Sequence, residues 1–397
     1  MTGCKKVTYE QVLAWRLRQQ GLAPRTDASA AEIVGRLAGV QAQVASSAEL
    51  AVATRQRKPA AGGRTAAGSA QMTAGSAQGA SASGVREGLA ARSLVKTWAM
   101  RGTLHLLRAE EAGAYLSLLG AARTWEKPAW QKAFGVSPRQ VAAMGEAVEE
   151  ILDGRVLTRQ ELTDAVLARD GLDGLGEQLA SGWSTVLKPL AWTGRLCQGP
   201  AQGQKVTFAA PRSWVPGWGG IPDPQEAARV VIPAYLRAHG PATPAAFDAW
   251  LLRGATRKPV LRGWFEELGD QLTEVEVDGE RGAYVLAEDA DALAATDPSR
   301  EVRLLAGFDQ YVLGPGTADT RLIAPSRRKA VSRAAGWISP VVVHGGRVVG
   351  VWEFTDEEVV VTLFEEAGDV PADALEAEAA HLARCTGRDR TVAVRKD

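Results

Sequence analysis

The chain has 397 residues, of which 46% are hydrophobic, and its 46 Lys and Arg residues balance 46 Asp and Glu residues. At roughly 100 to 200 residues per domain, this length predicts two to four folding units. A net charge of zero excludes a uniformly polycationic nucleic-acid coat and equally excludes a strongly acidic solvating chain, so any charged partner must meet a local patch.

Cysteine and histidine are scarce and scattered. The three cysteines are isolated, so neither a disulfide framework nor a CxxC metal site is predicted, and the four histidines include no ligand pair. The N-terminus lacks the apolar run of a signal peptide, and no stretch of about 18 consecutive apolar residues occurs. We therefore expect a cytoplasmic protein that acts as a monomer, with no metal, no other cofactor and no membrane partner.

The N-terminal part predicts a winged helix. Two capping boxes, at residues 8–11 and 29–32, each precede apolar residues at helical spacing, and a third short helix is expected over residues 47–55. A hairpin of two short strands is expected within residues 94–107. Three helices closed by a hairpin outline a first winged-helix unit over residues 1–107.

A low-complexity insert interrupts this unit at residues 57–84. It consists mainly of Ala, Gly, Ser, Thr and Gln, with GSAQ at residues 68–71 and again at 75–78, and it is too poor in apolar residues to bury a core. We expect a mobile, dispensable surface loop. A DNA-gripping arm is the less favoured alternative, indicated by basic residues at the entry to the insert, namely Arg55, Arg57, Lys58 and Arg64.

The outline of helices followed by a hairpin recurs twice. Residues 108–210 predict four helices, the last over 178–191, and two short strands around a turn-rich segment. Residues 211–290 predict three helices and a hairpin with Asp278-Gly279 at its turn.

The remaining residues, 291–397, predict a small β-rich domain of five strands with one helix near 371–386. The expected fold class is therefore α+β, with three tandem winged-helix units and a small β-rich C-terminal domain. A winged helix is above all a nucleic-acid-binding shape, so three of them predict a long contact along a duplex.

Charge is segregated in the C-terminal part. Residues 321–347 carry six Lys and Arg and no acid, whereas residues 356–378 carry nine Asp and Glu and no base. The basic run either binds phosphates, in a contact that weakens steeply with salt, or both runs are solvated faces that neutralise one another. The repeated winged-helix outline favours the first interpretation, with Arg327, Arg328 and Arg333 as candidate DNA contacts.

The chain has 12 tryptophans, a number that raises the question of base stacking. Four of them fall in apolar helix or strand patterns, namely Trp98, Trp192, Trp250 and Trp264. We therefore expect most of the tryptophans in the core.

Gln41 and Gln43 follow the second predicted helix. On a continuing helix, side chains two residues apart diverge by about 200°, so the two amides would point to different sides. Both address one target only if the helix ends near Gly39 or the pair lies at the mouth of the helix. A buried Gln41 costs free energy unless its amide is fully bonded, which favours a wet cleft. The alternative is a pair of glutamines that makes ordinary caps and turns.

Four blocks occur in order along the chain: RLAGVQAQ at residues 36–43, LVKTWAMRGTLHL at 94–106, RLLAGFDQY at 303–311, and GWISP at 336–340 followed by GGRVVGVW at 345–352. Together they resemble the AlkZ/YcaQ family of winged-helix DNA glycosylases, and the resemblance covers almost the whole chain. It implies a C-shaped clamp of three winged helices and a Gln-aliphatic-Gln motif that supplies the catalytic residues. Residue by residue, the motif matches Gln41 and Gln43, with the small Ala42 between them.

The activity that this resemblance implies is hydrolysis of the N-glycosidic bond of N7-alkylated purines in double-stranded DNA, bulky or cross-linked natural-product adducts included. N7-alkylated guanine is cationic and a good leaving group, so the enzyme has to place a water and stabilise an oxocarbenium-like transition state. A Gln carbonyl accepts a hydrogen bond from water while its NH2 holds a sugar or phosphate oxygen. No lysine nucleophile is implied, so the glycosylase is monofunctional. Some relatives protect producer organisms from their own alkylating metabolites, a self-resistance role.

Further residues are expected near DNA. Arg101, Thr103 and His105 alternate on a predicted strand, so one side of it carries all three, with His105 bonding a phosphate or orienting Gln43. A satisfied, half-buried imidazole is the alternative for His105. Asp309, in the FDQY block, is expected to support the interior of the clamp through a structural salt bridge.

A non-catalytic winged-helix protein, a regulator or lesion binder, is the second hypothesis, because many members of the family are labelled only as DNA-binding proteins. The two glutamines would then merely line the clamp. A regulator gives sequence-dependent footprints and two-fold symmetric half-sites, whereas a glycosylase binds duplex with little sequence preference. Catalytic turnover separates the two hypotheses.

Overall fold

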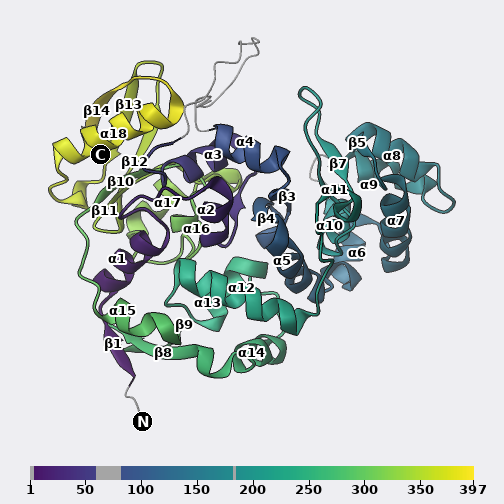
Figure 1. The fold of residues 1–397 in the computed structure, drawn as a ribbon, viewed down its shortest axis with the longest axis horizontal. Helices are drawn as coiled ribbons and strands as arrows, with labels where there is room; N and C mark the ends of the chain where they lie inside the picture. The colour runs from purple at the N-terminus through teal and green to yellow at the C-terminus, as the bar shows by residue number, and fades with distance from the viewer. Residues whose placement is uncertain (1–3, 60–81, 182–184) are drawn as a thin grey trace. The chain divides into compact units, whose positions relative to one another are not determined.

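Figure 1 shows the computed structural model of the chain, which describes residues 4–59, 82–181 and 185–397. Helices and three β-sheets make the protein α+β, as the sequence predicts. Most of the predicted insert, residues 60–81, lies outside the described residues.

The chain divides into two compact units, each built from separate segments. The first comprises Met1–Glu87, Pro233–Trp250 and Leu268–Asp397, and the second comprises Gly88–Ile232 and Leu251–Glu267. This division differs from the four consecutive ranges expected from the sequence. The boundaries of the winged-helix units therefore stay a prediction.

Short helices open the first unit, after the strand β1 (Lys5–Val7). They are α1 (Tyr9–Gln19), α2 (Ala30–Arg36) and α3 (Ala45–Ala53). Both predicted capping boxes are confirmed: the Thr8 and Ser29 hydroxyls accept the backbone N–H groups of Gln11 and Glu32, whose side chains bond back to the cap residues. The capping residues thus begin α1 and α2 where the sequence predicts.

A three-stranded sheet follows the third predicted set of helices, α12 (Pro224–His239), α13 (Pro244–Leu252) and α14 (Lys258–Glu266). The strands β8 (Leu272–Val277) and β9 (Glu280–Leu286) form the predicted antiparallel hairpin. At its turn, Asp278 and Gly279 both have positive φ, which explains the Asp-Gly pair. The strand β1 joins the other edge, parallel to β8, a pairing too short and too distant for the sequence to indicate.

The C-terminal sheet has five strands: β10 (Val302–Leu305), β11 (Val341–His344), β12 (Arg347–Phe354), β13 (Glu358–Leu363) and β14 (Thr391–Lys396). The first four pair antiparallel in sequence order, and β14 pairs parallel with β13 after the crossover helix α18 (Ala372–Thr386). Figure 1 shows α18 lying along this sheet, where it packs against β10 and β14. The predicted strands and helix of this region are confirmed.

The short helices α15 (Ala290–Ala294), α16 (Gln310–Leu313) and α17 (Arg328–Val331) were not predicted.

In the second unit, five strands lie in the order β4-β3-β6-β7-β5. They are β3 (Leu94–Trp98), β4 (Leu104–Arg108), β5 (Val156–Thr158), β6 (Cys197–Gln198) and β7 (Thr207–Ala209). Lys96 of β3 pairs with Gln198 of β6, so the first and second predicted hairpins belong to one sheet. The helices of this unit are α5 (Ala109–Ala121), α6 (Pro128–Phe134), α7 (Pro138–Ile151), α8 (Arg159–Leu167), α9 (Gly176–Ala180), α10 (Lys188–Trp192) and α11 (Pro211–Trp214).

The single helix predicted over residues 178–191 is wrong. Helix α9 ends at Ala180, Ser181 has a non-helical conformation, and α10 begins only at Lys188. Pro189 lies in the first turn of α10, where its missing N–H costs nothing, whereas inside a continuous helix it would break the hydrogen-bond ladder.

An ion pair between Arg55 and Asp309 lies in the core of the first unit, and both side chains are 0% exposed. The Arg55 guanidinium donates to both carboxylate oxygens of Asp309, at 2.7 and 2.8 Å, to the Ala51 carbonyl of α3 at 2.7 Å and to Gln20 Oε1 at 3.1 Å. Asp309 also accepts the Tyr311 N–H at 2.8 Å and thereby caps α16. The pair therefore joins the end of α3 to the start of α16, segments 254 residues apart.

Removing one partner of this pair leaves a buried charge without its counter-ion. We expect Arg55→Met to lower the free energy of unfolding by about 3–5 kcal/mol. Arg57→Met is the matched control, because Arg57 pairs with Asp27 at the surface and such pairs contribute at most about 1 kcal/mol. Urea unfolding followed by circular dichroism measures both, and equal losses in the two variants would contradict the prediction.

Two buried histidines predict destabilisation by acid. Burial, and then the charges of Arg101 for His105 and of Arg25 and Arg384 for His381, lower the pKa of each imidazole to about 3. The unfolded chain has the ordinary value of about 6.5 and takes up these protons first. The stability that the neutral imidazoles contribute is therefore complete above about pH 6.5 and is lost progressively as the pH falls toward 3.

The measurement is the free energy of unfolding between pH 7 and pH 5, above the range in which most carboxylates titrate. We expect it to fall with pH in the wild type, and to fall less in His105→Gln and in His381→Gln. An unchanged pH slope in both variants would show that these histidines titrate normally in the folded protein.

Candidate active site

Gln41 and Gln43 lie on an extended segment between two helices. Helix α2 ends at Arg36, and Ala38 and Gly39 then take positive φ, so the chain leaves the helix where the two-amide interpretation requires. Gln41 belongs to the short strand β2 (Val40–Gln41), and Gln43 follows it. The side chain of Ala42 between them is buried at 1% exposure, as expected if neighbouring residues of an extended chain face opposite sides.

The two glutamines differ in exposure. Gln41 is 8% exposed, whereas Gln43 is open to solvent. Both make polar contacts within the protein. Helix α3 begins two residues after Gln43, and its far end is held by the Arg55–Asp309 pair. The segment is thus fixed between two helices, one of which is anchored in the core.

Asp309 has no exposed surface, and its carboxylate is fully engaged by Arg55 and by the N-terminus of α16. Arg55 is equally buried, although the sequence predicts it as a basic residue at the entry to a DNA-gripping arm, and this prediction is wrong for Arg55. Local sequence does not indicate the burial, because the carboxylate that pairs with this guanidinium lies 254 residues away.

Arg101, Thr103 and His105 do not share one strand face, and this expectation is corrected. Strand β4 begins only at Leu104, and Arg101 lies in a tight turn with a left-handed φ of 58°. The hydroxyl of Thr103 bonds back to the Met100 carbonyl at 3.1 Å. A tight turn between β3 and β4 breaks the alternation that a continuous strand would give.

His105 is 0% exposed, so it offers no surface to a phosphate in this structure. Its Nδ1 lies 3.0 Å from the Thr103 carbonyl, and its Nε2 is buried without a hydrogen-bond partner among the described residues. With its pKa lowered to about 3 by burial, the imidazole is neutral at physiological pH. The structure thus places His105 in the core, and its expected role at a phosphate or beside Gln43 stays a prediction.

Two cations near the turn between β3 and β4 have no sequence signal of their own. A Cβ on Gly102 would lie 3.7 Å from Lys188 Nζ, so this ammonium sits against the turn. Burial, followed by the charge of Arg253, lowers the pKa of Lys188. Lys188 comes from α10 and Arg253 from the turn after α13, and only the packing of the second unit brings these two cations together.

The three candidate arginines of the basic run differ. Arg327 is bonded to both oxygens of Glu366 at 2.8–3.1 Å and to Asp397 at 2.6 Å, so its guanidinium is already engaged by two carboxylates, and its expected DNA contact stays a prediction. Arg328 and Arg333 are exposed and form no ion pair with any residue that the structure describes. The adjacent residues Arg327 and Arg328 therefore differ in their surroundings, because only Arg327 meets Glu366 and Asp397.

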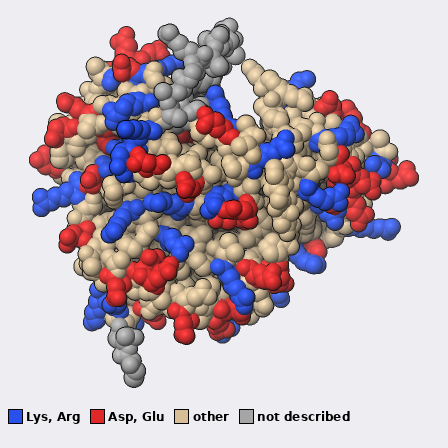
Figure 2. All heavy atoms as spheres, in the orientation of Figure 1, with Lys and Arg blue, Asp and Glu red and all other residues tan. Residues whose placement is uncertain are grey.

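Other cations of the run are also paired. Arg321 lies 3.6 Å from Glu280, and Arg347 lies 2.6 Å from Glu10, so part of the apparent basic patch is neutralised. On the face that Figure 2 shows, Lys and Arg lie interspersed with Asp and Glu. The pairing of Arg327 with the acidic run agrees with mutual neutralisation, and phosphate binding by its unpaired neighbours stays a prediction.

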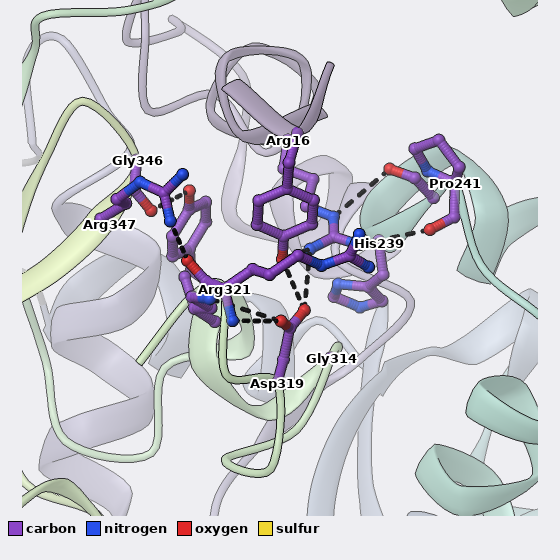
Figure 3. A network of polar contacts seen from close by, with 12 residues as sticks. Arg16, His239, Pro241, Gly314, Asp319, Arg321, Gly346 and Arg347 are labelled. Carbon is purple, nitrogen blue, oxygen red and sulfur yellow. Dashed lines mark hydrogen bonds and ion pairs between the residues drawn. The ribbon is translucent and has the colours of Figure 1, made fainter. Parts of the chain in front are cut away.

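A second polar cluster, which includes Arg16, Asp319 and Arg321, lines a cavity of about 200 Å³ (Figure 3). The Tyr9 hydroxyl donates to Asp319 at 2.5 Å, and the buried Arg16 guanidinium donates to Tyr9 at 3.1 Å and to the Gly240 and Pro241 carbonyls. Arg321 lies over the Tyr9 ring at 4.2 Å. Burial raises the pKa of Tyr9 to about 12, so the hydroxyl keeps its proton. These groups satisfy one another's hydrogen bonds, which indicates a structural role for the cluster.

Residues 4–59, 82–181 and 185–397 contain no group of three or more His, Cys, Asp or Glu side chains placed to hold a metal ion. None of their helices is both long enough and apolar enough to cross a bilayer.

Comparison with known proteins identifies the family. The model of the family "DNA glycosylase AlkZ-like" matches residues 34–385. The chain is 53% identical over 386 residues to the "Interstrand DNA cross-link repair glycosylase" of Streptomyces sahachiroi, covering 97% of this chain and 98% of that protein. It superposes on the solved structure of the Streptomyces sahachiroi DNA glycosylase AlkZ with a TM-score of 0.91, over 99% of this chain and 100% of that chain. The chain therefore belongs to the AlkZ-like family of DNA glycosylases.

Proposed function

We propose that this DNA glycosylase hydrolyses the N-glycosidic bond of N7-alkylated purines in duplex DNA, bulky and cross-linked adducts included, with a water positioned by Gln41 and Gln43. The observation that carries the proposal is the fixed, extended Gln41–Gln43 segment in a chain of this family. The name of the Streptomyces sahachiroi relative supports cross-linked adducts as substrates.

Two neutral amides suit this reaction because the substrate is already activated. Alkylation at N7 places a positive charge on the purine, so the base departs without a general acid. The remaining barrier is the formation of an oxocarbenium-like sugar and its capture by water. A glutamine carbonyl oxygen accepts a proton of the water, and the amide NH2 donates to a sugar or phosphate oxygen. Without an acidic general base, undamaged guanine is left intact.

The geometry supports unequal roles for the pair. Gln43 is exposed and able to meet the sugar-phosphate backbone, whereas Gln41 is mostly shielded from solvent. A shielded amide holds a water more rigidly than an exposed one, because few competing waters reach it. We assign the water to Gln41 and a backbone or sugar contact to Gln43. The motif supplies no lysine nucleophile, so the reaction ends at the abasic site.

The DNA-binding surface that we propose combines winged-helix units, arranged as the clamp that the family resemblance implies, with basic side chains. Arg328 and Arg333 contact phosphates from the first unit, and Arg101 and Thr103 do so from the turn between β3 and β4, next to Lys188. Asp309 supports the site through Arg55. The enzyme acts as a cytoplasmic monomer and requires no metal or other cofactor.

The glutamine roles are tested by base release. Purified wild type is incubated with duplex DNA carrying N7-methylguanine and, separately, a bulky N7 adduct, and abasic sites are revealed by alkaline cleavage. We expect Gln41→Ala and Gln43→Ala each to lower the single-turnover rate by about 100-fold or more, in the range found when one transition-state donor is removed.

Gln225→Ala serves as the control, since Gln225 is an exposed glutamine on α12 outside the motif. It should keep the wild-type rate. Wild type that binds duplex but releases no base from either substrate would contradict the proposal and favour a non-catalytic lesion binder. Full activity in both motif variants would instead contradict the assigned glutamine roles.

The arginine contacts are tested by the salt dependence of duplex binding. Each phosphate contact contributes about 0.9 to the slope of log K against log salt concentration. We expect Arg328→Ala and Arg333→Ala each to reduce this slope by about 1. Arg327→Ala, one residue away but occupied by Glu366 and Asp397, should leave the slope unchanged. Equal effects in all three variants would contradict the distinction.

A further inference from the structure

Trp337 is an exception among the tryptophans. The four that the sequence assigns to the core are confirmed there, with Trp98, Trp192, Trp250 and Trp264 all buried. Trp337 is 38% exposed, and it is the only aromatic side chain among the exposed large hydrophobics of the residues that the structure describes. An exposed indole, where the other described tryptophans are buried or partly buried, calls for an explanation.

The indole is displayed by a tight turn. Ser332 and Ile338 pair as an isolated antiparallel bridge, and the Arg333 N–H donates to the Trp337 carbonyl at 2.8 Å. Between them, Ala335 and Gly336 both have positive φ, which reverses the chain within three residues. The residues from Arg333 to Trp337 are all exposed. Trp337 therefore stands on a closed, hydrogen-bonded turn and not on a loose loop.

The turn rests on a rigid base. Trp337 packs edge-to-face on Phe308, with ring centroids 5.1 Å apart and planes at 79°. Gly307 permits close packing, because a Cβ there would lie 2.9 Å from the Ile338 carbonyl oxygen. Ser339 bonds to the Val331 and Ala330 carbonyls on the other side. The ring is thus held in place before any ligand arrives, which lowers the entropy lost on binding.

Unpaired positive charges lie close to Trp337 along the chain. Arg328, Lys329 and Arg333 lie within nine residues of Trp337, are exposed, and form no ion pair with any residue that the structure describes. Arg327, in the same run, is neutralised by Glu366 and Asp397. The combination of a held aromatic ring with unpaired cations matches a nucleic acid, whose bases stack and whose phosphates are anionic.

We propose that Trp337 stacks on a base of duplex DNA at the damaged site, while Arg328, Lys329 and Arg333 bind the flanking phosphates. The proposal rests on the proposed function and deepens it by naming a base contact. An aromatic ring pressed against a base step partly unstacks it, and an adduct that has already weakened stacking lowers that cost. The partner is double-stranded DNA.

The turn is also linked to the catalytic segment. Phe308 directly precedes Asp309, which holds Arg55 at the end of α3, and α3 begins two residues after Gln43. All of these residues belong to the first compact unit. A base contact at Trp337 and the glutamine pair are therefore held by one rigid framework, so stacking sets the position of the strand relative to Gln41 and Gln43.

The test measures stacking directly. The probe is a duplex with 2-aminopurine beside a 2′-fluorinated N7-methyldeoxyguanosine, in which the fluorine slows hydrolysis of the glycosidic bond, so that wild-type enzyme binds without turnover. Unstacking raises 2-aminopurine fluorescence. We expect wild type to raise it, Trp337→Ala to abolish most of the rise and to weaken binding about tenfold, and Trp337→Phe to retain both.

The salt dependence of duplex binding distinguishes an electrostatic contribution from a stacking contribution. Trp337→Ala should weaken binding equally at all salt concentrations, because it removes no charge, whereas Arg333→Ala should reduce the salt slope. Val394→Ala is the control for loss of an exposed apolar side chain in the same unit and should behave as wild type. Thermal unfolding verifies that each variant is folded, and the phenylalanine variant keeps the test valid if the alanine variant is unstable.

Two different failures are distinguishable. Unchanged fluorescence and affinity in folded Trp337→Ala would overturn the stacking proposal, even if base release by wild type is intact. Absence of base release by wild type from the unfluorinated duplex would contradict the proposed function, whatever Trp337 does. A salt-dependent defect in Trp337→Ala would also overturn the proposal, because it would assign the residue to the phosphate contact.

Discussion

The buried pair of Arg55 and Asp309 is the interaction on which the first unit depends. A guanidinium and a carboxylate, both without solvent, are tolerated only because each is satisfied on several sides: Arg55 by Asp309, Ala51 and Gln20, and Asp309 by Arg55 and the N-terminus of α16. The pair connects the glutamine segment, through α3, to the FDQY block. Gln20 extends the network to the Ala238 carbonyl and to His239. Geometry at the glutamines is therefore set by charges in the core.

Local pairing decides which cations of the positive run keep a free charge. The positive run from 321 to 347 is divided by the fold, since Arg321, Arg327 and Arg347 meet carboxylates while Arg328 and Arg333 meet none among the described residues. Of the unpaired cations, Arg333 begins the turn of Trp337 and Arg328 precedes that turn by one short helix. A glycosylase that scans DNA benefits from such an arrangement, because a few salt-sensitive contacts permit movement along the duplex, whereas a uniformly cationic face would bind too tightly everywhere.

Much of the local structure was predictable. The capping boxes, the Asp-Gly turn and the strands of the C-terminal sheet follow from hydrogen bonds and side-chain alternation within a few residues, and they lie where predicted. Helix α2 ends at Arg36, and Gly39 just beyond it is the kind of residue that favours such an end, because glycine tolerates the positive φ there. The helix over 178–191 and the shared face of Arg101, Thr103 and His105 were wrong, because a proline and a tight turn interrupt patterns that looked continuous.

The sequence alone determined the family, through four ordered blocks, and it determined the candidate glutamines, because a motif and the helix end beside it are local features. Tertiary structure decided which of the neighbouring charges are available. Arg55 and Arg327 look like surface bases along the chain, yet partners 254 and 39 residues away neutralise them. His105 looks like a phosphate contact and is buried. Whether a charged or aromatic side chain reaches solvent depends on its packing against residues that are distant in the sequence, and a local sequence pattern does not contain that information.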